Sequence, residues 1–326
     1  MRKPTVIPGL LSAVLLVTLA AFAASLTQIS LDSGSGGAAQ SSMLTSEGGT
    51  TASAARSSGP EAVAFDGQYI WVTRQFSNNV TRIKASDGSW GGTFAVGQNP
   101  VAVIHDRTGI WVANLESDTV MRLKANDGSI LLTVNVGDGP GGLVSDGSYI
   151  WVANRNDGTV TKVRARDGVV AGTFTVGTRP LGLAYDGANI WVANGQDNTV
   201  TKLRASDGAT LGAFAVGRGP FAVGFDGKYI WVTNFFSGTA SKLNPENGST
   251  LATAPVGDGA AGIAFDGLTV WVATNGTDSL SRVDPATGSV IATFSTGKSP
   301  MGVAFDGANI WVANFGSNSV STTLVK

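Results

Sequence analysis

The sequence has 326 residues, of which 43% are hydrophobic and 14% are charged, and its formal net charge is −1. This composition excludes a wholly disordered chain, and the balanced charge argues against a nucleic-acid-binding protein. The chain has no Cys and only one His, His105, so disulfides are excluded and the usual zinc ligand sets cannot be assembled. We therefore expect no nucleic-acid partner, no metal site and no cofactor.

The first 24 residues have the features of an export signal. Arg2 and Lys3 precede the apolar segment Leu10–Ala24 ("LLSAVLLVTLAAFAA"), which contains a small-x-small cleavage pattern. This segment is short for a membrane-spanning helix, and an uncleaved N-terminal anchor is the alternative. Residues 25–44, with the tract "LDSGSGGAAQSS", are interpreted as a flexible linker. The sequence predicts an exported protein, periplasmic, at the cell surface or secreted, with membrane contact only through such an anchor.

A repeat of 40 residues runs through the rest of the chain. The stretch "DGANIWVAN" at 186–194 recurs unchanged at 306–314, three repeats later. One Trp and, five residues before it, one Asp mark each of seven repeats. The Trp residues are Trp71, Trp111, Trp151, Trp191, Trp231, Trp271 and Trp311, and the Asp residues are Asp66, Asp106, Asp146, Asp186, Asp226, Asp266 and Asp306. A 40-residue period built from strand-like segments is typical of propeller blades.

Each repeat contains four short segments rich in β-formers. In the second repeat they fall within Gly97–Asp106, Gly109–Asn114, Thr119–Ala125 and Ser129–Val136. Asp-Gly pairs separate many of them, because such pairs tolerate the positive φ angles of tight turns. The sequence therefore predicts an all-β fold over residues 45–326, a seven-bladed β-propeller with four antiparallel strands in each blade.

The last repeat stops after its third predicted strand, which would leave the ring open and an edge unpaired. Shifting the sequence by 40 places Thr45–Pro60 over Ala85–Pro100, with Asp87-Gly88 matched by Glu47-Gly48. We therefore expect an N-terminal strand within this segment to complete the last blade.

The repeated Trp and Asp residues are interpreted as scaffold. Each Trp lies in the middle of a strand within an "IWV"-like run, so it is expected to pack between blades and not to form a sugar-stacking ring. Each Asp precedes a turn, and turn capping is preferred to a ring of Ca²⁺ ligands.

The segment "IWVTN" (Ile230–Asn234) and the several "IWVAN" segments resemble YVTN-type β-propeller repeats, with Trp in place of Tyr. The resemblance covers residues 45–326 and implies the fold, whereas YVTN-type repeats occur in proteins of several roles.

The chain is also similar to the streptogramin (virginiamycin B) lyases, which implies a His general base and Mg²⁺ near carboxylates. Only His105 could be that base. It stands where most other repeats have an aromatic residue such as Phe65 or Phe225, so it is interpreted as a packing residue. No "GxSxG" elbow is present, and no catalytic residue is predicted. A lyase-like or other metal-dependent propeller enzyme is kept as the alternative.

Two loops in each repeat vary in sequence and are expected on one face of the ring. The candidate binding residues there are Glu61, Arg74, Phe76, Arg155, Arg179, Arg218, Phe221, Phe235, Phe236, Met301 and Phe315. Aromatic residues beside charged ones are common at interaction sites, although the Phe side chains could instead plug the channel mouth. The predicted function is that of a monomeric binding or scaffold module. A cell-envelope protein, peptide or glycan suits the broad face, and a small molecule suits the mouth around Glu61, Phe221 and Met301.

Overall fold

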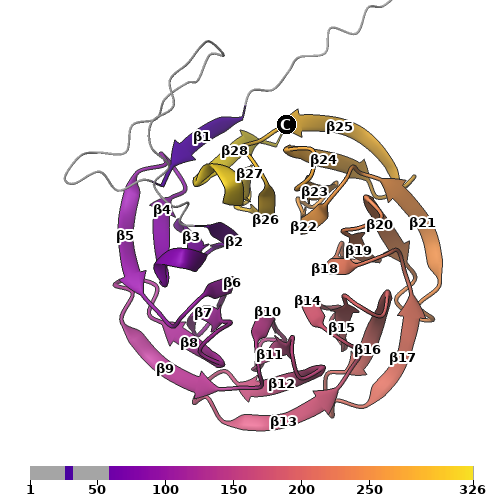
Figure 1. Ribbon diagram of the computed structural model, residues 1–326, viewed down its shortest axis with the longest axis horizontal. Helices are drawn as coiled ribbons and strands as arrows, with labels where there is room; N and C mark the ends of the chain where they lie inside the picture. The colour runs from indigo at the N-terminus through magenta and orange to yellow at the C-terminus, as the bar shows by residue number, and fades with distance from the viewer. Residues whose placement is uncertain (1–25, 32–58, 326) are drawn as a thin grey trace, which may run out of the picture.

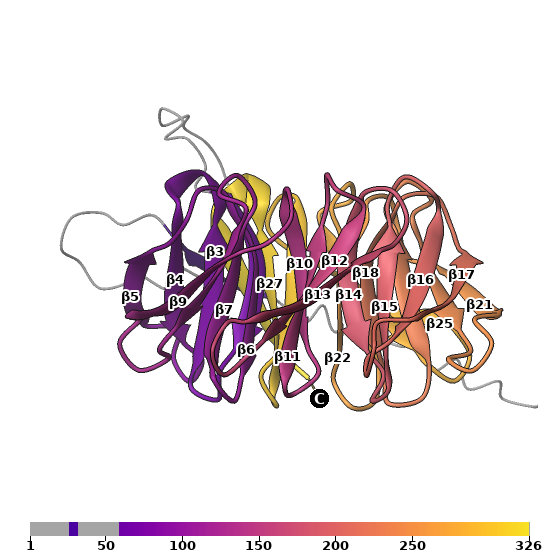
Figure 2. The same cartoon turned by 90° about the horizontal axis from the view of Figure 1, so that it is seen from below.

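The computed structural model describes residues 26–31 and 59–325, which form a ring of seven four-stranded antiparallel sheets (Figure 1). In blades 1 to 6 the first strand lies nearest the axis and the fourth forms the rim (Figure 1). Seen from the side, the sheets stand next to one another at one level (Figure 2). The predicted seven-bladed β-propeller is confirmed.

The strands follow the 40-residue repeat, because each repeat supplies the same apolar runs and turns. From axis to rim, blade 1 consists of β2 (Pro60–Phe65), β3 (Tyr69–Arg74), β4 (Asn79–Lys84) and β5 (Trp90–Ala95), blade 2 of β6 (Pro100–Asp106), β7 (Gly109–Asn114), β8 (Thr119–Leu123) and β9 (Ile130–Asn135), and blade 3 of β10 (Pro140–Ser145), β11 (Tyr149–Asn154), β12 (Thr159–Arg164) and β13 (Val170–Thr175). Blade 4 consists of β14 (Pro180–Tyr185), β15 (Asn189–Asn194), β16 (Thr199–Arg204) and β17 (Thr210–Ala215), blade 5 of β18 (Pro220–Phe225), β19 (Ile230–Asn234), β20 (Thr239–Leu243) and β21 (Thr250–Pro255), and blade 6 of β22 (Ala260–Phe265), β23 (Val270–Thr274), β24 (Ser279–Asp284) and β25 (Ser289–Ser295). Blade 7 consists of β26 (Pro300–Phe305), β27 (Asn309–Asn314), β28 (Ser319–Leu324) and β1 (Thr27–Ser30). Two short 3₁₀ helices, η1 (Gln75–Ser77) and η2 (Phe315–Ser317), follow β3 and β27.

An N-terminal strand closes the ring, as predicted, but it comes from a different segment. Strand β1 pairs antiparallel with β28, and Ile29 lies opposite Val320. The expectation that the closing strand lies within Thr45–Pro60 is wrong, because Pro60 begins β2 of blade 1 and β1 occupies the position. Strand β1 is also part of the region interpreted as a linker. Its apolar residues Ile29 and Leu31 are buried, which explains why this segment is ordered.

The remaining N-terminal predictions concern other residues. The predicted export signal (1–24), most of the predicted linker and residues 45–58 lie outside the described residues. Within the described part of the chain, no helix has the length and apolar character needed to cross a bilayer.

The seven repeated Trp side chains are buried and form the core between and within blades. Four of them pack against a Phe of the rim strand, as in Trp71 and Phe94, whose ring centroids are 5.4 Å apart. The neighbouring blade covers the other side, so that Trp71 shares a cluster with Val103 and Ile110. Burial of one indole contributes at most about 4–6 kcal/mol. The predicted packing role of these residues is confirmed.

The repeated Asp residues cap turns, as predicted, and they also hold the indoles. In blade 1, Asp66 Oδ1 accepts hydrogen bonds from the backbone N–H groups of Gln68 and Tyr69, at 2.8 and 2.6 Å. Its Oδ2 accepts one from Trp71 Nε1 at 2.7 Å. The same Asp–Trp bond occurs in blades 3 to 7. In blade 2, Thr108 Oγ1 accepts the indole hydrogen bond of Trp111 and donates to Asp106.

A cationic side chain on the third strand of blades 1 to 6 lies over the Trp ring of its own blade. These residues are Arg82, Arg122, Lys162, Lys202, Lys242 and Arg282. In the first five cases the cation also donates a hydrogen bond to a backbone carbonyl in a turn of the next blade, at 2.6 to 2.7 Å. Arg282 donates instead to Thr269 Oγ1 within its own blade. Each cation therefore combines cation–π attraction with a charge-assisted hydrogen bond.

Candidate functional site

The two variable loops of each blade lie next to each other on one face of the ring, as predicted. Backbone hydrogen bonds join them, from Gln75 to Gly59 in blade 1 and from Phe235 to Gly219 in blade 5. The equivalent bond in blade 7 joins Phe315 to Ser299. Side chains at the ends of the innermost strands and in these loops therefore converge around the axis.

A pocket of about 600 Å³ lies where these loops meet. Eight of the eleven predicted binding residues line it: Glu61, Arg155, Arg179, Phe221, Phe235, Phe236, Met301 and Phe315. The volume falls within the range of about 300–1,000 Å³ that is usual for ligand pockets. The variable positions of five blades thus contribute to one cavity.

The aromatic residues form two clusters at the pocket. In blade 5, Phe235 packs against both Phe221 and Phe236, with ring centroids 5.9 and 5.4 Å apart. Across the seam between blades 7 and 1, Phe315 and Phe76 meet edge to face at 5.6 Å. Phe236 is 68% exposed and Phe76 is 60% exposed, whereas Phe235 and Phe315 are partly buried. Four of these rings line the cavity, and the exposed faces of Phe236 and Phe76 leave two apolar surfaces open to solvent.

Three predicted residues do not line the pocket. Phe76 touches it only through Phe315, and Arg218 is an exposed loop residue outside it. Arg74 is 8% exposed and ends strand β3, so its placement in a surface loop is wrong. It occupies the strand position that Asn114 and Asn154 occupy in blades 2 and 3, and its side chain belongs to the scaffold.

Charged groups of opposite sign face the cavity. Glu61 comes from the innermost strand of blade 1, and Arg155 and Arg179 come from loops of blades 3 and 4. Burial raises the pKa of the Glu61 carboxyl to about 7, against the opposing charge of Arg155. Burial and the neighbouring Arg179 lower the pKa of Arg155, while Glu61 raises it. Near neutral pH, Glu61 is therefore only partly ionised, and the cavity carries net positive charge.

The backbone of Arg179 is in the left-handed region, with a φ of 56°. The equivalent positions in the other blades are Gly59, Asn99, Gly139, Gly219, Gly259 and Ser299, all with positive φ. For a residue such as Arg, this conformation costs about 1 kcal/mol relative to Gly. The turn therefore does not require Arg at position 179, and the Arg179 side chain lines the pocket.

The list of candidate binding residues omits several residues of the pocket. Val101, Leu181, Gln75 and Asn275 also line the cavity. Val101 and Leu181 follow the Pro that begins the innermost strand, as Phe221 and Met301 do, so their repeat position could have identified them. A second, polar hollow of about 720 Å³ adjoins the pocket and shares Arg155 and Arg179 with it.

His105 is on strand β6 but is exposed to solvent, so its interpretation as an inner packing residue is wrong. Val101, at the start of the same strand, lines the pocket. The two residues are four positions apart along the strand, which is about 13 Å at the usual rise. His105 is not among the residues that line the pocket. Among residues 26–31 and 59–325, no three His, Asp or Glu side chains form a group that could hold a metal ion.

Comparison with known proteins identifies similar folds at low sequence identity. No family model matches, which leaves the resemblance to YVTN repeats without such support, and no curated protein matches either. A streptogramin B lyase structure is 17% identical with a TM-score of 0.71, over 82% of this chain and 94% of that chain. Hydrazine synthase of Kuenenia stuttgartiensis is 19% identical with a TM-score of 0.72, over 86% of this chain and 99% of that chain.

A third similar structure is a catalytically inactive His-to-Ala variant of virginiamycin B lyase from Staphylococcus aureus with quinupristin. It is 18% identical with a TM-score of 0.70, over 82% of this chain and 95% of that chain. At these identities the comparisons define only the fold class of this protein, a seven-bladed β-propeller, and no activity.

Proposed function

We propose that this protein is an exported binding module whose ligand occupies the channel-mouth pocket. The observation that carries the proposal is the convergence of two aromatic clusters and two Arg side chains on one cavity of about 600 Å³. The strained backbone of Arg179 and the exposure of Phe236 add to it, because neither feature stabilises the fold.

The charges suggest the chemistry of the ligand. Arg155 and Arg179 offer guanidinium groups to an anion, and Glu61 opposes them only weakly while it is partly protonated. The Phe walls suit an aromatic or branched apolar group beside that anion. A peptide segment of an envelope protein that carries a carboxylate next to such a side chain satisfies both requirements. A neutral glycan would offer the two guanidinium groups only hydroxyl acceptors and no opposite charge.

Replacing Arg179 with Gly should separate binding from folding. Arg179→Gly removes a cation from the pocket and relaxes the left-handed backbone. We expect the affinity for N-acetylphenylalanine, a probe with a carboxylate beside an aromatic ring, to fall roughly 10- to 100-fold. The free energy of unfolding should meanwhile rise by about 0.5–1 kcal/mol. Calorimetric titration and thermal denaturation measure the two effects.

The matched control is Arg218→Ala, which removes the same charge from an exposed loop outside the pocket. Its affinity for the probe should stay within about twofold of the parent protein, because screened surface charges contribute little. Equal weakening in both variants would show that the pocket does not hold the ligand. Failure of the parent protein to bind the probe or related aromatic carboxylates would refute the proposed ligand class.

The enzyme alternative depends on His105, the only imidazole in the chain. Because His105 is exposed and outside the pocket, we expect His105→Phe to bind the probe as the parent protein does. The introduced ring should pack as Phe65 and Phe225 do and change the free energy of unfolding by no more than about 1 kcal/mol. Turnover of quinupristin that His105→Phe abolishes, with the fold intact, would favour a lyase instead.

A further inference from the structure

At the seam between blades 7 and 1, no described residue places a cation over the Trp ring, as blades 1 to 6 do. Thr322 on β28 occupies the position of Lys162 or Lys202, because it lies opposite Trp311 as those residues lie opposite their own Trp. Thr322 Oγ1 is buried and has no hydrogen-bond partner among the described residues. Trp311 and its hydrogen bond to Asp306 are present as in the other blades, while the described residues supply no cation.

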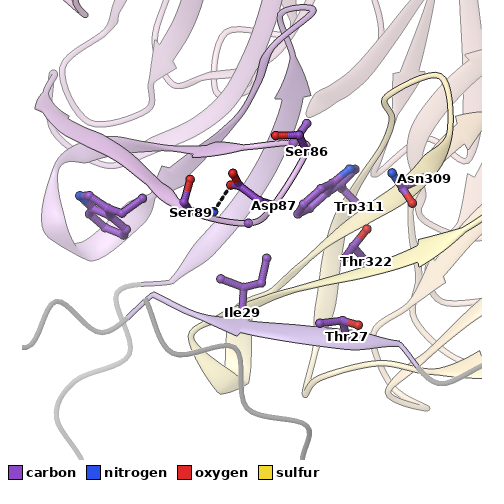
Figure 3. Close-up of a pocket in the computed structure, with 11 residues that line it drawn as sticks. Thr27, Ile29, Ser86, Asp87, Ser89, Asn309, Trp311 and Thr322 are labelled. Carbon is purple, nitrogen blue, oxygen red and sulfur yellow. Dashed lines mark hydrogen bonds between the residues drawn. The ribbon is translucent and has the colours of Figure 1, made fainter. Parts of the chain in front are cut away.

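A pocket of about 470 Å³ lies at this place. Figure 3 shows Trp311 and Thr322 on blade 7, Ser86 and Asp87 on the turn of blade 1, and Ile29 on β1 around it. Ile29 lies opposite Val320, at the rim-strand position where blades 1, 3, 4 and 6 have a Phe. Because Ile is smaller than Phe, more space is left beside Trp311.

The hydrogen-bond acceptors for a cation are already in place. At the next interface Arg82 Nη1 donates to the carbonyl oxygens of Ala125 and Asn126, at 2.6 and 2.9 Å. The equivalent residues at the seam are Ala85 and Ser86, and both line the pocket. Their carbonyl groups accept no hydrogen bond from any described residue. The indole of Trp311, the residues that carry the two carbonyl oxygens and the Thr322 hydroxyl therefore line a space with room for a cationic head group and its alkyl stem.

The charge of the pocket agrees with this chemistry. Asp87 contributes a carboxylate, and its hydrogen bonds with Ser89 hold its pKa below the usual value. Lys84 is 3.6 Å from that carboxylate at an exposed position, so it neutralises only part of the charge. The described lining residues include no Lys or Arg.

We propose that the seam pocket is a binding site for a guanidinium or primary ammonium group carried on an alkyl stem. The group lies against Trp311, donates to the carbonyl oxygens of Ala85 and Ser86, and donates to Thr322 Oγ1. The source is either a small alkylamine or guanidine, or an Arg or Lys side chain of a partner. The site is separate from the channel-mouth pocket and does not depend on the function proposed for it.

Ethylguanidinium, which corresponds to the end of an Arg side chain, tests the proposal on the mature protein. We expect calorimetric titration to give a dissociation constant on the order of 1 mM, as is usual for a small ligand that makes a single charged contact. Thr322→Arg should place a tethered guanidinium in the pocket, abolish this binding and raise Tm by about 2 °C or more. Thr322→Val, which removes the hydroxyl without filling the space, should weaken binding about fivefold. Equal binding by the parent protein and Thr322→Arg would overturn the proposal, as would no binding at all.

A second variant reproduces the seam at another interface. Lys202 lies over Trp191 and donates to the carbonyl of Pro245 at 2.6 Å. Lys202→Thr should lower Tm, and n-propylammonium, which replaces the lost part of the side chain, should restore part of the loss. If n-propylammonium stabilised Lys202→Thr but ethylguanidinium did not bind the parent protein, the seam pocket would be closed to cations. That result would overturn the assignment.

The source of the cation is tested by a peptide. If acetyl-Gly-Arg-Gly-amide binds at least tenfold more tightly than ethylguanidinium, and Thr322→Arg abolishes both, the pocket receives a side chain of a partner. Equal affinities indicate a small molecule.

Discussion

Leu31→Asp should open the ring and lower the free energy of unfolding by about 4 kcal/mol or more, because it buries a charge where a Leu side chain is fully enclosed. Leu31 directly follows strand β1, and its backbone N–H donates a hydrogen bond to the carbonyl oxygen of Asn318 at 3.0 Å. The corresponding fall in Tm is roughly 8 °C or more for a domain of this size. Thermal denaturation followed by circular dichroism measures it.

Ser30→Asp provides the control for this variant. Ser30 is exposed on the same strand and lies opposite Ser319, so a new carboxylate there stays in water. We expect its unfolding free energy to change by less than about 0.5 kcal/mol. If Leu31→Asp unfolded at the same temperature as the parent protein, the pairing of β1 with β28 would not contribute to stability.

Glu61→Gln should stabilise the protein above neutral pH and have little effect under acidic conditions. The folded state raises the pKa of the Glu61 carboxyl from 4.5 to about 7, so folding favours its protonated form. Protonated Glu61 therefore contributes to the free energy of unfolding in full below about pH 4.5, and this contribution is lost as the pH rises through 7. The full shift corresponds to about 3 kcal/mol, and because the side chain is partly exposed, we expect a gain of about 2 kcal/mol at pH 8.

Urea denaturation at pH 4, 6 and 8 measures this effect as the gap between the parent protein and Glu61→Gln. The repeated Asp residues are common to both proteins, so their contribution cancels in the gap. Glu246→Gln, at an exposed turn between β20 and β21, controls for the loss of one carboxylate. Parallel stability curves for the parent and Glu61→Gln across this pH range would contradict a buried, weakly ionised Glu61.

The features that repeat could be predicted from the sequence, because each blade solves the same packing problem. The spacing of Trp and Asp gave the number of blades, the core positions and the turn caps. The hydrogen bond from Trp71 Nε1 to Asp66 could also have been inferred, since a buried indole N–H needs an acceptor and the Asp is always five residues away.

The closing strand was misplaced because the connection between β1 and β2 does not keep the 40-residue period. The segment "QISL" (residues 28–31) alternates polar and apolar residues as "TFTV" (residues 173–176) does, with Ile29 and Leu31 at the positions of Phe174 and Val176. This alternation is the signal that could have located the closing strand. A strand that pairs with a distant partner can have any connection length, so a fixed shift cannot find it.

The positions of the candidate residues were largely predictable, because positions that vary among equal blades have no shared packing role, whereas their binding role stays a prediction. Eight of the eleven residues meet at the pocket. Arg74 failed because its place in the repeat is a buried strand end. The raised pKa of Glu61 and the seam pocket could not be predicted, since both depend on residues brought together by ring closure.

Closure by β1 also fixes the order in which the molecule can be completed. Each of blades 1 to 6 is built from consecutive strands and can form as the chain leaves the ribosome. Blade 7 needs β1, which is made first, and β28, which is made last. Throughout synthesis β1 therefore has no partner and the growing arc has an exposed edge at each end. We therefore expect ring closure to be a late event, because it joins the strands that are farthest apart in the sequence, and we expect a folded ring to reopen first at the seam.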